Sequence, residues 1–151
     1  MHPPSNRQNA VNTAISKVVL PPDIGIRAWR DEDFPAVQRL SRIEKWPTPE
    51  ERPEEALHAW QRSWPTFVAT ERGQIIGFVR ALTDEEVTTY IAEILVEAAW
   101  RGHGLGKALL DACHLLHPHT RQDLLSTEES DSFYEAVGFR PFPGFRKNYT
   151  W

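Results

Sequence analysis

The chain has 151 residues, a length typical of one domain, so separate catalytic and regulatory lobes are not expected. Its formal net charge of −4 argues against a general nucleic-acid partner, and its single cysteine excludes an intramolecular disulfide framework or a cysteine-rich zinc module. No apolar run approaches the roughly 20 residues that cross a bilayer, and the N-terminus lacks the pattern of a secretory signal. We therefore expect a cytoplasmic protein without a membrane partner.

The polar start of the chain and its periodic remainder predict two parts of unequal size. Residues 1–22 are polar and end in Pro21 and Pro22. We expect them to form a flexible N-terminal arm in front of a single domain over residues 23–151.

Apolar periodicity predicts the elements of that domain. In chain order they are a strand at residues 24–29, helices at 34–43 and 54–63, strands at 66–70, 74–82 and 88–96, a helix at 104–116, a strand at 124–126, a helix at 131–137, and closing strands at 139–142 and 147–151. This order indicates an α/β fold, in which a mixed sheet carries helices on its faces.

The most informative segment is residues 90–107, where an apolar strand runs into a turn with three glycines and a helix follows. Glycines allow positive φ angles and a close approach of the backbone to a ligand. The first turn of a helix offers unpaired N–H groups and the positive end of the helix dipole, which together favour a phosphate group. Arg101 and Lys107 add positive charge nearby.

Two other glycine-rich motifs do not fit this segment. The Walker motif requires Ser or Thr after its lysine, but Ala108 follows Lys107, so no hydroxyl is available for magnesium. The dinucleotide fingerprint would need its third glycine where Lys107 or Leu109 stands. The remaining pattern is Arg-x-x-Gly-x-Gly, from Arg101 to Gly106, although a plain strand–helix turn is the structural alternative.

This pattern, together with Phe-Tyr-x-x-x-Gly-Phe from Phe133 to Phe139, resembles the GNAT superfamily of acyl-CoA-dependent N-acyltransferases. The likeness covers residues 24–151 and implies a central mixed, mostly antiparallel sheet flanked by helices. It also implies acetyl-CoA as co-substrate without a metal, and a small-molecule or peptide amine as acceptor.

The resemblance further implies which residues bind the coenzyme. They belong to the end of the strand, the glycine turn, the start of the helix and one later position, and they are Ile94, Leu95, Val96, Arg101, Gly102, His103, Gly104, Leu105, Gly106, Lys107 and Thr127. Thr127 is a departure, because many family members carry Asn at this position. Its hydroxyl can still form a hydrogen bond, so we expect a rearranged contact.

Family members usually transfer the acyl group directly in a ternary complex, and this implies two catalytic side chains. Tyr134 matches the tyrosine that faces the thiolate and can protonate it, although it can also be a half-buried aromatic of the last helix. Glu93 is the candidate general base, with an ion pair to Arg80 as the alternative. A second carboxylate, Glu97 or Asp131, could instead act through water.

Three further expectations concern the remaining aromatic and sulfur-containing residues. Trp46, beside several prolines, could form a wall of the acceptor pocket, whereas Trp60 and Trp64 read as core residues. Cys113 reads as a core thiol, and the histidines near it do not form a zinc pattern.

Two other classes of function stay open. A non-catalytic acyl-CoA-binding or regulatory module could use the same turn, and a nucleotide-binding fold could carry an atypical glycine turn. The sequence does not name the amine or the acyl chain, and it leaves a homodimer open.

Overall fold

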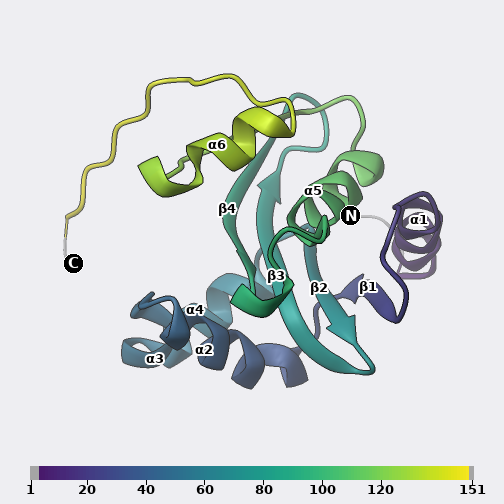
Figure 1. Cartoon of the computed structure of the whole chain (residues 1–151), viewed down its shortest axis with the longest axis horizontal. Helices are drawn as coiled ribbons and strands as arrows, with labels where there is room; N and C mark the ends of the chain where they lie inside the picture. The colour runs from purple at the N-terminus through teal and green to yellow at the C-terminus, as the bar shows by residue number, and fades with distance from the viewer. Residues whose placement is uncertain (1–3, 150–151) are drawn as a thin grey trace.

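The computed structural model describes residues 4–149 and shows a central sheet with helices on both faces (Figure 1). Its elements are α1 (Pro4–Ser16), β1 (Ile24–Ala28), η1 (Asp31–Asp33), α2 (Phe34–Ile43), α3 (Thr48–Glu51), α4 (Pro53–Gln61), β2 (Thr66–Glu71), β3 (Gln74–Thr83), β4 (Thr88–Val96), η2 (Ala98–Trp100), α5 (Leu105–Leu116), β5 (Arg121–Leu124) and α6 (Glu128–Ala136). The five strands lie in the order β1-β2-β3-β4-β5. All pairs are antiparallel except β4 with β5. The expected mixed, mostly antiparallel sheet is therefore confirmed.

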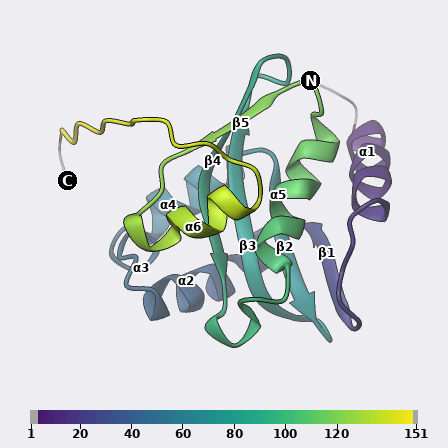
Figure 2. The ribbon, with the colours of Figure 1, turned by 45° about the horizontal axis from the view of Figure 1, so that its top comes forward.

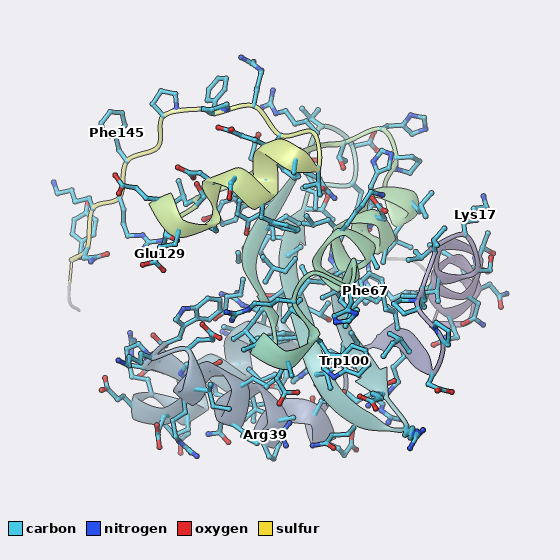
Figure 3. The ribbon with its side chains drawn as sticks, viewed as in Figure 1. Lys17, Arg39, Phe67, Trp100, Glu129 and Phe145 are labelled. Atoms are coloured by element: carbon cyan, nitrogen blue, oxygen red, sulfur yellow. The ribbon has the colours of Figure 1, made fainter. Side chains whose placement is uncertain are left out.

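The centre of the sheet is buried on both faces, which explains the nearly continuous apolar runs of β2 and β3. Phe67 and Val79 belong to the core cluster under α5, while Phe78 and Trp60 belong to the cluster under α2 and α4. Figure 3 shows Phe67 inside the molecule. Arg72 and Gly73, both at positive φ, form the tight turn between β2 and β3.

The N-terminal segment differs from the flexible arm that the sequence predicts. Residues 4–16 form α1, which packs beside α5 and β1 (Figure 2), and residues 1–3 lie outside the described part of the chain. Val11 and Ala14 are buried at helical spacing and join the helix to the core. The sequence hides this helix because most of its residues are polar and its apolar face is only a few residues wide.

Shortening Val11 to alanine tests whether α1 is part of the folded domain. The change removes two buried methyl groups, so we expect the free energy of unfolding to fall by about 1–2 kcal/mol. Asn9→Ala, on the exposed side of the same helix, is the matched control. Denaturant unfolding of both variants measures the difference, and equal stability of the two would mean that α1 does not pack.

The closing strands predicted at residues 139–142 and 147–151 are absent from the part of the chain described up to residue 149. This segment runs outward beyond α6 without pairing to the sheet, and Phe145 is 96% exposed (Figures 1 and 3). Pro141 weakens the first of these predicted strands, because proline cannot donate a hydrogen bond to a strand ladder. Residues 150 and 151 lie outside the described range.

Within residues 4–149, no helix combines the length and the apolar character needed to cross a membrane.

Candidate active site

The parallel pair at the edge of the sheet opens partway along its length. β3 pairs with β4 as far as Val96, whereas β5 pairs with β4 only from Thr88 to Ile91 (Figure 2). Beyond Ile91, the outer edge of β4 therefore has no strand partner among the described residues. The backbone of Ile94, Leu95 and Val96, which the resemblance assigns to the coenzyme, lies along this free edge.

A β-bulge in β4 decides which face of the sheet carries Glu93. Arg80 lies opposite Glu93, but the next residue of β3 lies opposite Ile91, so Ala92 is the extra residue. In a regular strand, Ile91, Glu93 and Leu95 would share one face. The bulge separates them: Ile91 packs in the cluster under α5, and Leu95 packs in the cluster under α2 and α4. Glu93 therefore lies on the same face as Leu95.

On that face Glu93 forms the ion pair that the sequence offers as an alternative role. Arg80 Nε donates to Glu93 Oε2 at 2.6 Å, and both side chains are about one-fifth exposed, at 20% and 21%. The pair borders a pocket of about 280 Å³. Its other lining residues come from α3, α4 and the residue between them: Thr48, Pro49, Arg52, Glu55, Ala56, Ala59 and Trp60.

The pocket wall corrects one expectation and adds residues that the sequence does not reveal. Trp46 is not among the lining residues and instead packs edge-on against Phe78, with ring centroids 6.5 Å apart. Trp60, expected in the core, is buried there and also lines the pocket. Arg52 and Glu55 pair with each other at the start of α4. No sequence motif marks these two residues, because only the packing of α4 on the sheet brings them to Glu93.

The glycine turn precedes α5 and leaves its N-terminus open. Gly102 and Gly104 have φ angles of 81° and 84°, and an added Cβ at either would meet no atom within 4 Å. Ala108 N–H donates to the Gly104 carbonyl oxygen, so the N–H groups of residues 105–107 have no partner inside the helix. The turn thus has the backbone conformation, free donors and space that suit a diphosphate.

The third glycine of the motif has a different role. A Cβ on Gly106 would lie 2.8 Å from Cζ of Phe133, so this glycine leaves room for the Phe133 ring of α6 against the backbone of α5. Leu105 is fully buried, so its side chain belongs to the core under α5. The close contact between Gly106 and Phe133 joins the two sequence motifs in space.

The basic residues around the turn already have acidic partners. Arg101 pairs with Glu44, the residue that follows α2, and also donates to the Val96 carbonyl oxygen at 3.1 Å. Lys107 pairs with Asp111 one helical turn later, at 2.6 Å. A bound anion would therefore compete with these carboxylates for both side chains.

A groove of about 690 Å³ adjoins the turn on the side of α1. His103, Gly104 and Lys107 line one wall, and Lys17 and Leu20 line the other. The His103 ring lies beside Trp100, with centroids 5.4 Å apart. Figure 3 marks Lys17 at the end of α1 and Trp100 ahead of the turn. The N-terminal segment, which the sequence places outside the domain, thus forms part of this groove.

Tyr134 lies in α6, where its ring packs near Phe133 and Phe139, with centroids 5.1 and 5.6 Å away. It contacts the core cluster under α5, as Ile94 and Val96 also do, so it lies on the opposite face of β4 from Glu93. Burial raises the pKa of the Tyr134 phenol, which favours its protonated form. The two predicted catalytic side chains thus lie on either side of the free edge of β4.

Thr127 begins α6, in a box of reciprocal hydrogen bonds with Ser130. Its N–H donates to Ser130 Oγ at 3.2 Å, and the Ser130 N–H donates to the Thr127 carbonyl oxygen at 3.0 Å. This helix cap is a role that the sequence does not assign to Thr127. Asp131, one of the alternative carboxylates, accepts a hydrogen bond from Ser126.

Cys113 is fully buried in α5, and its burial raises the pKa of the thiol. Within the described range, no three His, Cys, Asp or Glu side chains gather closely enough to hold a metal ion. We expect Cys113 in the native protein to resist a thiol reagent and to react only after unfolding, because the thiolate is the reactive form. Reaction with Ellman's reagent, with and without denaturant, measures this. Rapid reaction of the native protein would contradict it.

Comparison with known proteins places the chain in a family. The family model described as the acetyltransferase (GNAT) domain matches residues 62–141, and the chain belongs to this family.

Two curated relatives match parts of the chain. It is 30% identical over 101 residues to "Probable acetyltransferase TAP2" of Glycine max, a match that covers 64% of this chain and 40% of that protein. It is 31% identical over 83 residues to a glucosamine 6-phosphate N-acetyltransferase of Trypanosoma brucei brucei, which covers 49% of this chain and 56% of that protein. The chain therefore spans about half the length of these relatives.

Solved structures share the fold over most of the chain. A candidate acetyltransferase from Deinococcus radiodurans R1 has a TM-score of 0.68 at 30% identity and covers 84% of this chain and 89% of its own. A GNAT-family acetyltransferase from Streptococcus pneumoniae TIGR4 has a TM-score of 0.67 at 18% identity and covers 85% and 98% of the two chains. At 18% identity, the second likeness shows the fold alone.

Proposed function

We propose that this protein is an N-acetyltransferase that moves an acetyl group from acetyl-CoA to a primary amine by direct attack. The observation that carries the proposal is the free outer edge of β4. The pocket with Glu93 lies on one side of this edge, Tyr134 lies on the other, and the glycine turn lies at its end. An acyl donor along this edge could meet an amine from one face and release its thiol toward the other.

Each part of the site suits one part of the coenzyme. Acetyl-CoA supplies the activated acyl group as a thioester. The free N–H groups at the start of α5, with Gly102 and Gly104, would hold the diphosphate, and Arg101 and Lys107 would add charge if they left their acidic partners. The backbone groups that β4 presents on its free edge within residues 94–96 would bind the pantetheine arm, where the Val96 carbonyl oxygen already accepts from Arg101.

The proton movements balance over the reaction. Glu93 takes a proton from the acceptor ammonium, and the neutral amine then attacks the thioester carbonyl carbon, so that a C–N bond forms. The C–S bond breaks as Tyr134 gives its phenolic proton to the departing thiolate. Solvent returns a proton to Tyr134, while Glu93 and the new amide nitrogen release theirs. The products are the amide, CoA thiol and one proton.

An acetylation assay with a panel of amines tests the proposal. The panel holds polyamines, amino acids, amino sugars including glucosamine 6-phosphate, and peptides with free amino groups. We expect thiol release from acetyl-CoA to depend on at least one amine, with hydrolysis in the absence of amine as the control. Thermal unfolding with acetyl-CoA, ATP and NAD is measured in parallel, because a ligand at 100 times its Kd stabilises the fold by about 2.7 kcal/mol.

The outcomes separate the classes of function that the sequence leaves open. Stabilisation by acetyl-CoA without turnover of any amine would indicate a non-catalytic acyl-CoA-binding module. Stabilisation by ATP or NAD, and none by acetyl-CoA, would indicate a nucleotide-binding protein. Either result would contradict the proposed transferase.

A further inference from the structure

A chain of hydrogen bonds runs behind the Glu93 carboxylate, from the end of α4 across β3 to β4. The Ser63 hydroxyl donates to the Ala59 carbonyl oxygen at 2.6 Å and accepts from Arg80 Nη1 at 3.1 Å. Arg80 Nε then donates to Glu93 Oε2 at 2.6 Å. The single hydroxyl proton of Ser63 is donated to Ala59, so the Ser63 oxygen can only accept the hydrogen bond from Arg80. The donor and the acceptor of each bond in the chain are therefore fixed.

This network fixes the guanidinium of Arg80 from two sides. Ser63 is buried, and Arg80 is only 20% exposed, so neither side chain has room to change its rotamer freely. The planar fork of arginine can reach Ser63 and Glu93 at once, whereas the single ammonium of lysine presents no such pair of fixed donors. The β-bulge at Ala92 is required as well, since it places Glu93 on the face that Arg80 occupies.

Stability alone does not account for such a pair. Removing two charges from water costs free energy, and their mutual attraction often only offsets that cost. Apolar side chains of similar volume at the same positions are often at least as stabilising. The pair also lies at a pocket rather than within the packed clusters. One oxygen of Glu93, Oε1, accepts no hydrogen bond from any residue of the described part of the chain, so it is left to bind a ligand proton.

We infer that Arg80 and Ser63 are positioning residues that hold the Glu93 carboxylate with one oxygen directed to the acceptor amine. The inference rests on the proposed acetyl transfer and adds two residues to its machinery. Arg80 acts only through Glu93, and Ser63 acts only through Arg80. The other charged groups of the pocket, Arg52 and Glu55, pair with each other and stand apart from this chain of bonds.

A double-mutant cycle on kcat tests the inference with the amine that the panel identifies. Arg80→Met should lower kcat about 10- to 100-fold and leave the KM for acetyl-CoA unchanged, because a misplaced catalytic group loses its alignment. In the Glu93→Gln background the same substitution should lower kcat by no more than about twofold, since residues that act as a unit are not additive. Ser63→Ala should show the same pattern with a loss of about threefold to fivefold.

Two further variants separate positioning from a general loss of structure. Arg80→Lys keeps the charge but not the fork, so its kcat should fall between those of the wild type and Arg80→Met. Arg62→Met changes an exposed arginine next to Ser63 and should leave kcat unchanged. The thermal unfolding of every variant is recorded, and kcat is measured only at temperatures where the variant is folded.

The outcomes distinguish a failure of the positioning role from a failure of the proposed acetyltransferase function. Turnover by the wild type, with equal losses from Arg80→Met in both backgrounds, would overturn the positioning role and leave the transferase intact. An unchanged kcat in the folded Arg80→Met variant would overturn it as well. A wild type that acetylates none of the panel amines would overturn the proposed function, and the positioning role would fall with it.

Discussion

Replacing Glu93 by glutamine is expected to lower kcat about 10²- to 10⁴-fold, the range that a general base contributes. The substitution keeps the size of the side chain and an oxygen that can accept from Arg80, but an amide cannot take up the proton of the acceptor ammonium. The glycine turn and the free edge of β4 do not involve this carboxylate, so the KM for acetyl-CoA should stay close to that of the wild type. Initial rates at varied amine and acetyl-CoA concentrations measure both constants.

A second carboxylate of the same pocket is the matched control for this prediction. Glu55 lines the pocket, pairs with Arg52 and is more exposed than Glu93, so Glu55→Gln should change kcat little. Comparing kcat of the two variants shows whether the reaction depends on the Glu93 carboxylate itself or only on the negative charge of the pocket. A Glu93→Gln variant with wild-type kcat and a lower unfolding temperature would assign the ion pair with Arg80 to structure alone.

Local sequence patterns predict the parts of the site that depend on neighbouring residues. The glycine turn can be read from the sequence because the free N–H groups and positive φ angles arise within a few residues of Gly104. The Tyr134 motif can be read for the same reason, since its glycine ends the helix that carries the tyrosine. The strands at the centre of the sheet follow from alternation and short connections, which are also local.

Long-range register decides the features that the sequence does not reveal. The sequence around Ala92 does not indicate a bulge, because residues 91–96 have the pattern of a regular strand that is apolar except for Glu93. The opening between β4 and β5 depends on where β5 stops pairing, which is a property of two strands far apart in the chain. The contact between Gly106 and the Phe133 ring is also long-range, because only the folded structure brings α6 to the start of α5.

Burial explains the two errors at the ends of the domain. The helix α1 is mostly polar, so its stability depends on a narrow contact with α5 that its own composition does not show. Aromatic residues after Gly138 suggest strands by alternation, but Pro141 removes a donor from the first, and residues 139–149 pair with no strand of the described sheet. In both segments tertiary contacts, or their absence, override the local pattern.

Replacing Tyr134 by phenylalanine is expected to lower kcat about 10²-fold, with little change in the KM for acetyl-CoA. The ring and its packing against Phe133 and Phe139 remain, and only the phenolic proton that would reach the departing thiolate is lost. Because burial raises the pKa of Tyr134, the phenol stays protonated at neutral pH, and the activity that depends on it should fall only at a pH above the usual range of a phenol. The phenylalanine variant should lack that alkaline fall.

The control for this prediction is a tyrosine of β4 that lies where β5 still covers the strand. Tyr90 is partly buried in β4, before the point where β5 stops pairing, and Tyr90→Phe removes a hydroxyl at no proposed step. Its kcat should match that of the wild type, which would show that losing a phenol near the sheet is not harmful in itself. If Tyr134→Phe also keeps the wild-type kcat, the ring serves packing alone and the thiolate receives its proton from water. Since the ring contacts with Phe133 and Phe139 remain, the lost hydroxyl should leave the fold unchanged, and the comparison isolates one proton transfer.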